Sequence, residues 1–184
     1  MRSALTILII FVLTACTNRQ EEDTFKNKPL PYFDLASYFE KEAIRLQTRN
    51  PLLTKTVGQN GESEKKDIKI TDWKSELGFF IASDINKPAW RNSYRVIKKG
   101  NKIIYLSKDD GLRTQKIEIL SKPHGGIKHI SILNQTSNIL YTSTEYLNYS
   151  PDSFYTINKQ QKVLLNSLNT YQIKSEFTNE NSNK

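Results

Sequence analysis

Residues 94–133 of the sequence, YRVIKKGNKIIYLSKDDGLRTQKIEILSKPHGGIKHISIL, decide the fold. Apolar and polar residues alternate in this stretch, so that Ile117 and Ile119 share one face of a strand while Lys116 and Glu118 lie on the other. Short strands joined by short turns predict an antiparallel meander. Turn-forming residues separate the expected strands at 99–101, 108–111 and 123–126.

The meander is expected to continue toward the C-terminus. Tyr171 and Ile173 alternate with Gln172 and Lys174, which predicts a last strand with one face in water. Apolar and aromatic residues predict the strands before it at 127–133, 139–146 and 154–157, with turns at 135–138 and 150–152.

A helix is expected before the strands. Asp34 is a good N-cap residue, and apolar residues recur at helical spacing from Leu35 to Leu46. Pro51 ends the segment, because the residue before a proline avoids helical angles. The helix should therefore bury one stripe of side chains, formed by Leu35, Phe39, Ala43 and Leu46.

A hairpin and a second helix are expected next. Asn60-Gly61 is a strong hairpin turn between the strand-like segments 53–57 and 67–70. A second helix should run from position 72 to about 85, although Gly78 is a weak helix former. The predicted fold class is α+β, an antiparallel β-sheet meander with two N-terminal amphipathic helices packed on one face. It forms a single domain over residues 32–178, followed by a disordered tail at 179–184.

The first sixteen residues have the features of a secretory signal. Arg2 supplies a positive charge, and the apolar run at 4–13 suits a signal peptide but is too short to cross a bilayer. The run ends at Leu13-Thr14-Ala15-Cys16, which resembles the lipobox of bacterial lipoproteins. The resemblance implies that residues 1–15 are a signal peptide and that Cys16 is lipidated after their removal. The alternative is an ordinary secretory signal in which Cys16 falls by accident.

The resemblance implies a cell-envelope protein that its lipid attaches to the outer membrane. Thr17 stands where an aspartate would favour retention in the inner membrane. The acidic group at 21–23 fits either a surface-export signal or a solvated linker, which leaves open the side of the membrane. Residues 16–31 are polar and predict a flexible, lipidated tether. Cys16 is the only cysteine, so no disulfide can form within the chain.

The sequence contains no motif for catalysis, and we predict a protein without enzymatic activity, cofactor or metal. His124 and His129 lack partners at zinc-ligand spacing. Asp109-Asp110 precedes a glycine, which is typical of a hairpin turn and not of a catalytic carboxylate pair. Sites assembled from distant residues leave no motif, so a hydrolase remains a less favoured alternative.

The chain carries a net charge of +8, and its basic residues concentrate between Arg95 and Lys128. The predicted export makes nucleic acid unsuitable as a partner, whereas anionic lipid or polysaccharide suits a basic surface. The alternative is that the lysines keep the sheet soluble and protect its edges. Trp90 lies in an irregular connection, where it would either bind a ligand or close the end of the sheet. The candidate binding residues are Trp90, Arg91, Lys98, Lys99 and Lys102.

Two functions are predicted ahead of catalysis. The first is a non-catalytic binding or assembly module that contacts another envelope protein, anionic lipid or polysaccharide. Aromatic residues between Tyr141 and Tyr155 suit such a partner. The second is a lipid or lipoprotein carrier with a curved sheet, similar in architecture to the outer-membrane receptor of the lipoprotein-sorting system. A filled core would favour the first function, and an unfilled apolar cavity the second.

Overall fold

The structure, a computed structural model, describes residues 29–164 and 167–178. The chain divides into two compact units, Met1–Pro31 and Tyr32–Lys184, and the fold described below belongs to the second. The predicted signal peptide, Cys16, most of the predicted tether and the predicted tail lie outside the described residues.

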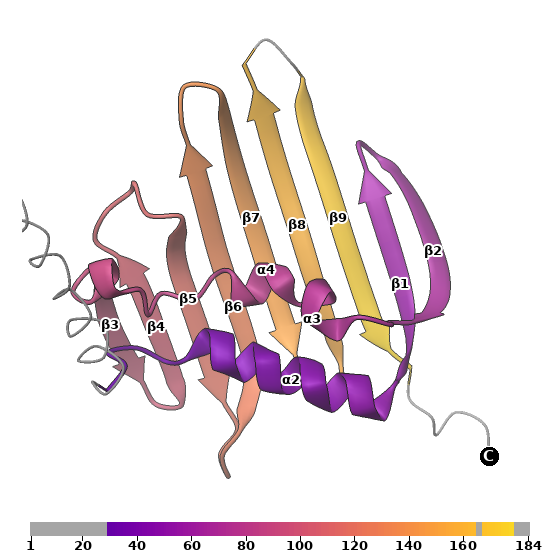
Figure 1. Ribbon diagram of the computed structural model, residues 1–184, viewed down its shortest axis with the longest axis horizontal. Coiled ribbons are helices and arrows are strands. Elements are labelled where there is room, and N and C mark those ends of the chain that lie inside the picture. Colours follow the sequence, from indigo (N-terminus) through magenta and orange to yellow (C-terminus); the bar gives the residue numbers. More distant parts are fainter. Residues whose placement is uncertain (1–28, 165–166, 179–184) are drawn as a thin grey trace, which may run out of the picture. The chain divides into compact units, whose positions relative to one another are not determined.

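Nine antiparallel strands form a single sheet in the order β2-β1-β9-β8-β7-β6-β5-β4-β3 (Figure 1). Each strand from β3 to β8 pairs with the next one along the chain, which confirms the predicted meander. The strands are β1 (Leu52–Gln59), β2 (Glu62–Lys69), β3 (Tyr94–Lys99), β4 (Lys102–Ser107), β5 (Thr114–Ser121), β6 (Ile127–Ser137), β7 (Tyr141–Ser150), β8 (Phe154–Val163) and β9 (Leu168–Phe177).

The predicted hairpin forms from β1 and β2. Asn60 and Gly61 both have positive φ, 53° and 94°, as a two-residue turn of type I′ requires. β1 then pairs antiparallel with β9, so the N-terminal hairpin extends the meander beyond its last strand. Sequence patterning predicted the hairpin but not this pairing.

Replacing Gly61 by alanine is expected to lower the free energy of unfolding by about 1–2 kcal/mol, because a Cβ atom disfavours positive φ. Gly78→Ala is the matched control: Gly78 has no positive φ, and a Cβ there meets no atom within 4 Å. The control should be neutral or stabilising by about 0.5 kcal/mol. Denaturant unfolding compares the two variants, and equal losses would contradict a special role for the turn.

The first predicted helix is α2 (Leu35–Arg49). The Asp34 side chain accepts a hydrogen bond from the Ser37 amide at 2.9 Å, as an N-cap residue does. Asn50 adopts a left-handed conformation with φ 47° and ends the helix before Pro51. The predicted apolar stripe is buried: Leu35, Phe39, Ala43 and Leu46.

The second predicted helix is not continuous. Two four-residue helices, α3 (Trp73–Glu76) and α4 (Gly78–Ile81), take its place, and neither reaches Ile85. Leu77 interrupts the helical geometry with φ −88° and ψ 7°, immediately before Gly78. Trp73, Leu77, Phe80 and Ile85 are all fully buried. Packing of these bulky side chains outweighs the weak helical tendency around the glycine.

The helices α2, α3 and α4 lie in front of one face of the sheet in Figure 1. The Phe39 ring of α2 contacts Tyr149 of β7, with ring centres 5.1 Å apart, and also Phe80 of α4 at 4.8 Å. The Trp73 ring of α3 contacts Tyr155 of β8 at 6.4 Å. Among the described residues, no helix covers the opposite face of the sheet.

The turn between β6 and β7 differs from the prediction. Ile139 and Leu140 were expected to begin a strand, but β7 begins at Tyr141. The Asn138 side chain accepts hydrogen bonds from the amides of Leu140 and Tyr141, both at 2.9 Å, and this closes the turn. Ile139 and Leu140 are therefore exposed, by 90% and 66%.

Candidate functional site

A row of side chains crosses five neighbouring strands on the helix-free face of the sheet. Strand register pairs Tyr146 of β7 with Asn158 of β8, and Asn158 with Gln172 of β9. Gln172 pairs with Gly58 of β1, which in turn pairs with Ser63 of β2. Five strands at about 4.8 Å spacing give this row, here named the polar row, a length of about 19 Å.

The face on which the polar row lies follows from strand alternation. Tyr149 and Tyr155 are fully buried and contact residues of the helices. Tyr146 and Asn158 stand three positions from these tyrosines along β7 and β8, so their side chains point to the opposite face. Tyr146 is 48% exposed there.

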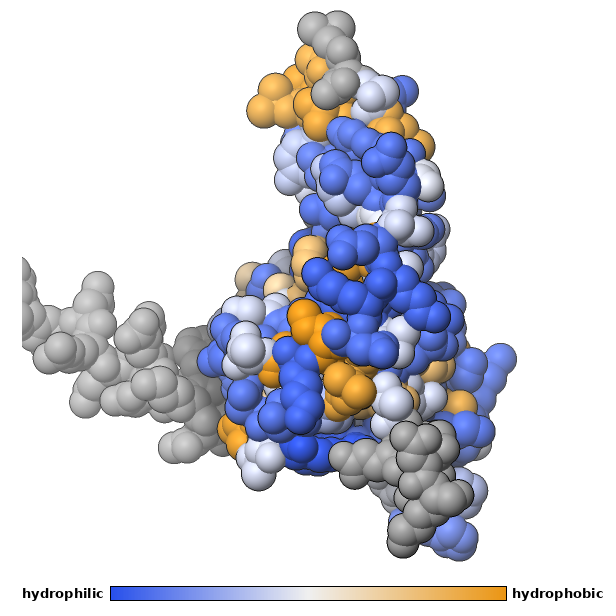
Figure 2. Space-filling model, turned by 90° about the vertical axis from the view of Figure 1, so that its right-hand side faces the viewer, coloured by the Kyte–Doolittle hydropathy of each residue, from blue (hydrophilic) through white to orange (hydrophobic). Residues whose placement is uncertain are grey.

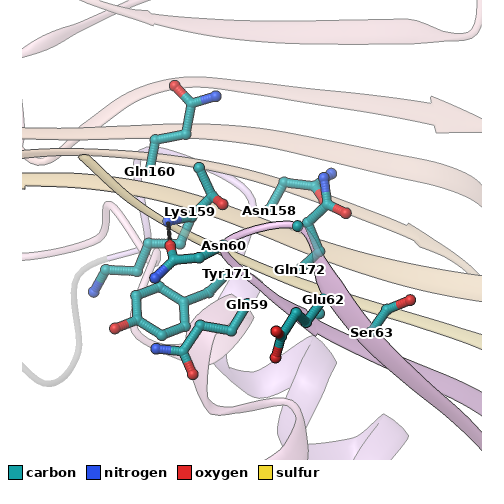
Figure 3. Close-up of a pocket in the computed structure, with 12 residues that line it drawn as sticks. Gln59, Asn60, Glu62, Ser63, Asn158, Lys159, Gln160, Tyr171 and Gln172 are labelled. Atoms are coloured by element: carbon teal, nitrogen blue, oxygen red, sulfur yellow. Dashed lines mark hydrogen bonds between the residues drawn. The ribbon is translucent and has the colours of Figure 1, made fainter. Parts of the chain in front are cut away.

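Gly58 leaves a depression in the middle of the polar row. A Cβ atom on Gly58 would lie 3.3 Å from the Glu62 carbonyl oxygen, 3.6 Å from the Ser63 Cβ and 3.7 Å from the Gln172 Cβ. The pocket at this position has a volume of about 260 Å³. Figure 3 shows the residues that line it: Gly58, Gln59, Asn60, Gly61, Glu62, Ser63, Asn158, Lys159, Gln160, Thr170, Tyr171 and Gln172.

Hydrogen bonds to β9 hold the hairpin turn that forms one wall of the pocket. The Asn60 amide donates to the Thr170 carbonyl at 3.0 Å, and the Thr170 amide donates to the Asn60 Oδ1 at 2.9 Å. The Asn60 Nδ2 also donates to the Asn169 Oδ1 at 3.3 Å. The turn therefore continues the β1–β9 pairing after the last paired residues, Gln59 and Tyr171.

The pocket lining is mostly neutral and able both to donate and to accept hydrogen bonds. Five residues with side-chain amides line it, together with Ser63 and Thr170, which carry hydroxyls. Strand alternation places the Gln59 side chain on the helix side, with its partner Tyr171. Of its two charged side chains, Lys159 also lies 3.4 Å from Glu145, while Glu62 lies on the hairpin. The amides are Gln59, Asn60, Asn158, Gln160 and Gln172. Such a lining suits a ligand rich in hydroxyl groups better than an acyl chain or a strongly charged group.

The sequence-predicted binding residues lie at two ends of β3. Trp90 belongs to a short 3₁₀ helix, η1 (Pro88–Trp90), and Arg91 follows it, both before the start of β3. Lys98 and Lys99 end β3, about 16 Å along the strand from its first residue, and Lys102 begins β4. Alternation also places Lys98 on the helix side, opposite to Lys99. The structure therefore does not bring the five residues together.

Acidic side chains interrupt the basic stretch. Glu118 lies 2.5 Å from the Lys116 Nζ and 3.1 Å from the Lys102 Nζ. Hydrogen bonds from these two lysines, chiefly from Lys116, lower the pKa of Glu118 below its usual value. Trp90 is half-buried and packs against the core, with the Lys87 Nζ 4.1 Å from its ring centre. These contacts are those of residues that stabilise the fold.

Three carboxylates on the helix side hold the layers together. Glu42 of α2 accepts a short hydrogen bond from Tyr149 of β7 and pairs with Arg45 at 2.7 Å. Glu76 of α3 accepts from the Tyr155 hydroxyl at 2.5 Å and pairs with Lys55 of β1 at 2.6 Å. Burial, followed by the neighbouring carboxylate, raises the pKa of each tyrosine.

The third carboxylate, Glu145 of β7, pairs with Arg113, which precedes β5, at 2.6 Å and accepts from the Asn134 amide at 3.2 Å. All three acids are thus occupied in ionic contacts within the fold. In the described part of the chain, no group of three or more His, Cys, Asp or Glu side chains is arranged to hold a metal ion.

Sequence reasoning missed most of the polar row, because its residues come from five separate strands. Tyr146 belonged to the predicted aromatic concentration, which the structure splits between the two faces of the sheet. No helix within the described residues has the length and apolarity to cross a membrane. The sequence matches no protein-family profile, and comparison with curated proteins and with solved structures also finds no match.

Proposed function

We propose that this protein is a non-catalytic binding module of the bacterial cell envelope, and that its polar row binds a hydroxyl-rich polysaccharide. The lipid anchor at Cys16 and the outer-membrane location belong to this proposal and rest on the resemblance of Leu13–Cys16 to a lipobox. The observation that carries the binding role is the amide-lined depression at Gly58, in line with the exposed ring of Tyr146.

The chemistry of the polar row supports a sugar polymer. Each amide can donate and accept at once, which matches the paired donor and acceptor character of sugar hydroxyls. An exposed tyrosine ring adds a flat apolar surface, and fixing it on binding costs little conformational entropy. The row also runs straight across the strands over about 19 Å, which suits an extended chain better than a compact ligand.

The packing of the helix side supports a binding module over a lipid carrier. A carrier would keep an apolar space between helices and sheet for the acyl chain. Phe39, Phe80 and Tyr149 fill this space in the protein, are fully buried and contact one another.

Binding to arrayed bacterial envelope polysaccharides tests the proposal. Gln172→Ala removes an amide from the polar row, and we expect about fivefold weaker binding, because a ligand hydrogen bond contributes about 1 kcal/mol. Tyr146→Ala should weaken binding at least as much. Ile44→Ala is the control: this apolar residue is 68% exposed on α2, on the helix side of the sheet, and lies outside the polar row and its pocket.

The control should bind as the unmodified protein does. Equal losses in Tyr146→Ala and Ile44→Ala would contradict binding on the helix-free face. Retention of binding in both Gln172→Ala and Tyr146→Ala would rule out the polar row as the site. Circular dichroism of each variant verifies that the sheet is intact.

A further inference from the structure

Two hairpin turns meet at one end of the sheet and expose apolar side chains. The β6–β7 turn and the β8–β9 turn lie side by side, because the Leu164 amide donates to the Leu140 carbonyl at 2.8 Å. Tyr141 and Val163 pair directly below them. We name four residues the apolar tip: Ile139, Leu140, Leu164 and Leu168, which are 90%, 66%, 60% and 54% exposed.

The apolar tip stands at the end of a polar extension of the sheet. Figure 2 shows hydrophobic residues at this end, above a hydrophilic stretch that the hairpin strands form. The helices lie across the lower part of the sheet in Figure 1, whereas the ends of β6–β9 reach beyond them. Exposed apolar residues that are clustered in this way mark a contact with a membrane or a partner.

The two segments that carry the apolar tip contain lysines but no acidic residues. Residues 134–144 and 158–172 contain no aspartate or glutamate, and their only charged side chains are Lys159 and Lys162. Lys162 is exposed and precedes Val163 at the end of β8. The rest of these segments consists largely of threonine, serine, asparagine and glutamine. Lys159 pairs with Glu145 at 3.4 Å, so Lys162 is the lysine that suits the apolar end to anionic lipid headgroups.

The side-chain types favour a bilayer over a protein partner. Protein interfaces draw most of their binding energy from tryptophan, tyrosine and arginine, and leucine is under-represented there. The apolar tip is entirely aliphatic: one isoleucine and three leucines. Aliphatic side chains gain free energy from any apolar surroundings and need no shaped pocket, which is the condition at a membrane interface.

We propose that the apolar tip inserts into the headgroup region of a bilayer that contains anionic phospholipid. This contact is separate from the predicted lipid on Cys16 and from the polar row. It would hold the sheet at a second point of the membrane, with the polar extension spanning the layer of headgroups and bound water.

A fluorescent reporter at the tip tests the insertion in the full chain. The chain's N-terminal apolar segment would itself bind vesicles, so the measurement must be local to the tip. Ile139→Cys, combined with Cys16→Ser, allows an environment-sensitive dye to be attached at position 139 only. Lys122→Cys, in the exposed turn between β5 and β6 at the other end of β6, is the matched control position.

Vesicles of mixed phosphatidylglycerol and phosphatidylcholine should shift the emission of the dye at position 139 to the blue. Lipids that carry a quencher in the headgroup region should reduce the emission intensity of this dye. The emission of the dye at position 122 should not change. Leu140→Ser with Leu164→Ser should abolish the response while circular dichroism stays unchanged, because both residues are exposed. Lys162→Gln should weaken the response to anionic vesicles about fivefold.

Three outcomes would overturn the proposal. The first is an unchanged emission of the dye at position 139 although the chain sediments with the vesicles, because the tip then stays in water. A second is an equal response on vesicles of phosphatidylcholine alone, which would refute the role of anionic lipid. The third is a blue shift that needs no vesicles and grows with protein concentration, because the tip would then bind a second copy of the chain.

Discussion

Replacing Trp73 by alanine is expected to lower the free energy of unfolding by about 3–5 kcal/mol, the range for removing a buried aromatic side chain. Trp73 is fully buried, and its ring stacks on Phe177 with centres 6.0 Å apart and planes 5° from parallel. Its ring also meets Tyr155 edge-on at 6.4 Å. The substitution therefore weakens the attachment of α3 to β8 and to the end of β9. A loss of this size is a large part of the stability of an ordinary domain.

The second tryptophan provides a matched control. Trp90 is half-buried, and the Lys87 Nζ lies over its ring. Trp90→Ala should lower the free energy of unfolding by about 1 kcal/mol, as an average substitution does. Urea unfolding followed by circular dichroism measures both variants. If Trp90→Ala destabilised the protein as much as Trp73→Ala, the assignment of Trp73 to the main core would be wrong.

Stability is expected to fall steeply above a pH of about 10, where tyrosine in an unfolded chain ionises. Burial is the largest cause that raises the pKa of five tyrosines in the folded protein. These tyrosines stay neutral in the fold, whereas those of the unfolded chain lose their protons and so favour unfolding. The five are Tyr38, Tyr94, Tyr105, Tyr149 and Tyr155.

The buried tyrosines make the stability depend on pH only in the alkaline range. Below the unfolded pKa both states are protonated, so these tyrosines contribute no pH dependence there. Above it, each buried tyrosine removes about 1.4 kcal/mol per pH unit until its folded pKa is reached. Tyr149 and Tyr155 are fully buried and alone account for about 2.7 kcal/mol per pH unit.

Tyrosinate absorbance and circular dichroism, recorded together through an alkaline titration, test this prediction. The tyrosinate absorbance of the buried tyrosines should appear only in the cooperative step in which the circular dichroism of the sheet is lost. Tyr149→Phe should reduce the pH dependence of stability by about 1.4 kcal/mol per pH unit, because one buried hydroxyl is gone. Ionisation of all nine tyrosines in one gradual step, with the sheet intact, would contradict the burial of these rings.

Local sequence signals predicted several elements correctly. The N-cap at Asp34 and the stop at Pro51 define α2, and Asn60-Gly61 defines the first hairpin. Alternation and turn residues predicted the meander from β3 to β9. Each of these signals acts within a few residues of the chain, so a single sequence is sufficient to show it.

The wrong expectations have a common cause. A continuous second helix through Ile85 was expected from apolar spacing, but the burial of Trp73, Leu77 and Phe80 is achieved with two short helices. Ile139 was assigned to a strand because it is apolar, yet it lies in the turn that Asn138 closes. Apolar character predicts burial only where the fold provides a surface to pack against.

The candidate site was harder to predict than the fold. The basic and aromatic residues that the sequence pointed to, Trp90 and Lys98 among them, are distributed over two ends and two faces of β3. The residues of the polar row carry no local motif, because neutral amides are common on any exposed strand. Only their alignment across the strands distinguishes them.

By itself, the sequence determined the meander from β3 to β9, the first hairpin turn and the N-cap of α2, as well as the absence of acidic residues from segments 134–144 and 158–172. Only the tertiary structure decided that β1 pairs with β9, which places Gly58 beside Gln172 and completes the polar row. It also decided that the turns at Leu140 and Leu164 share a hydrogen bond and form one apolar tip. The physical reason is that strand register joins residues far apart along the chain, and a shift by one position would turn every side chain to the other face.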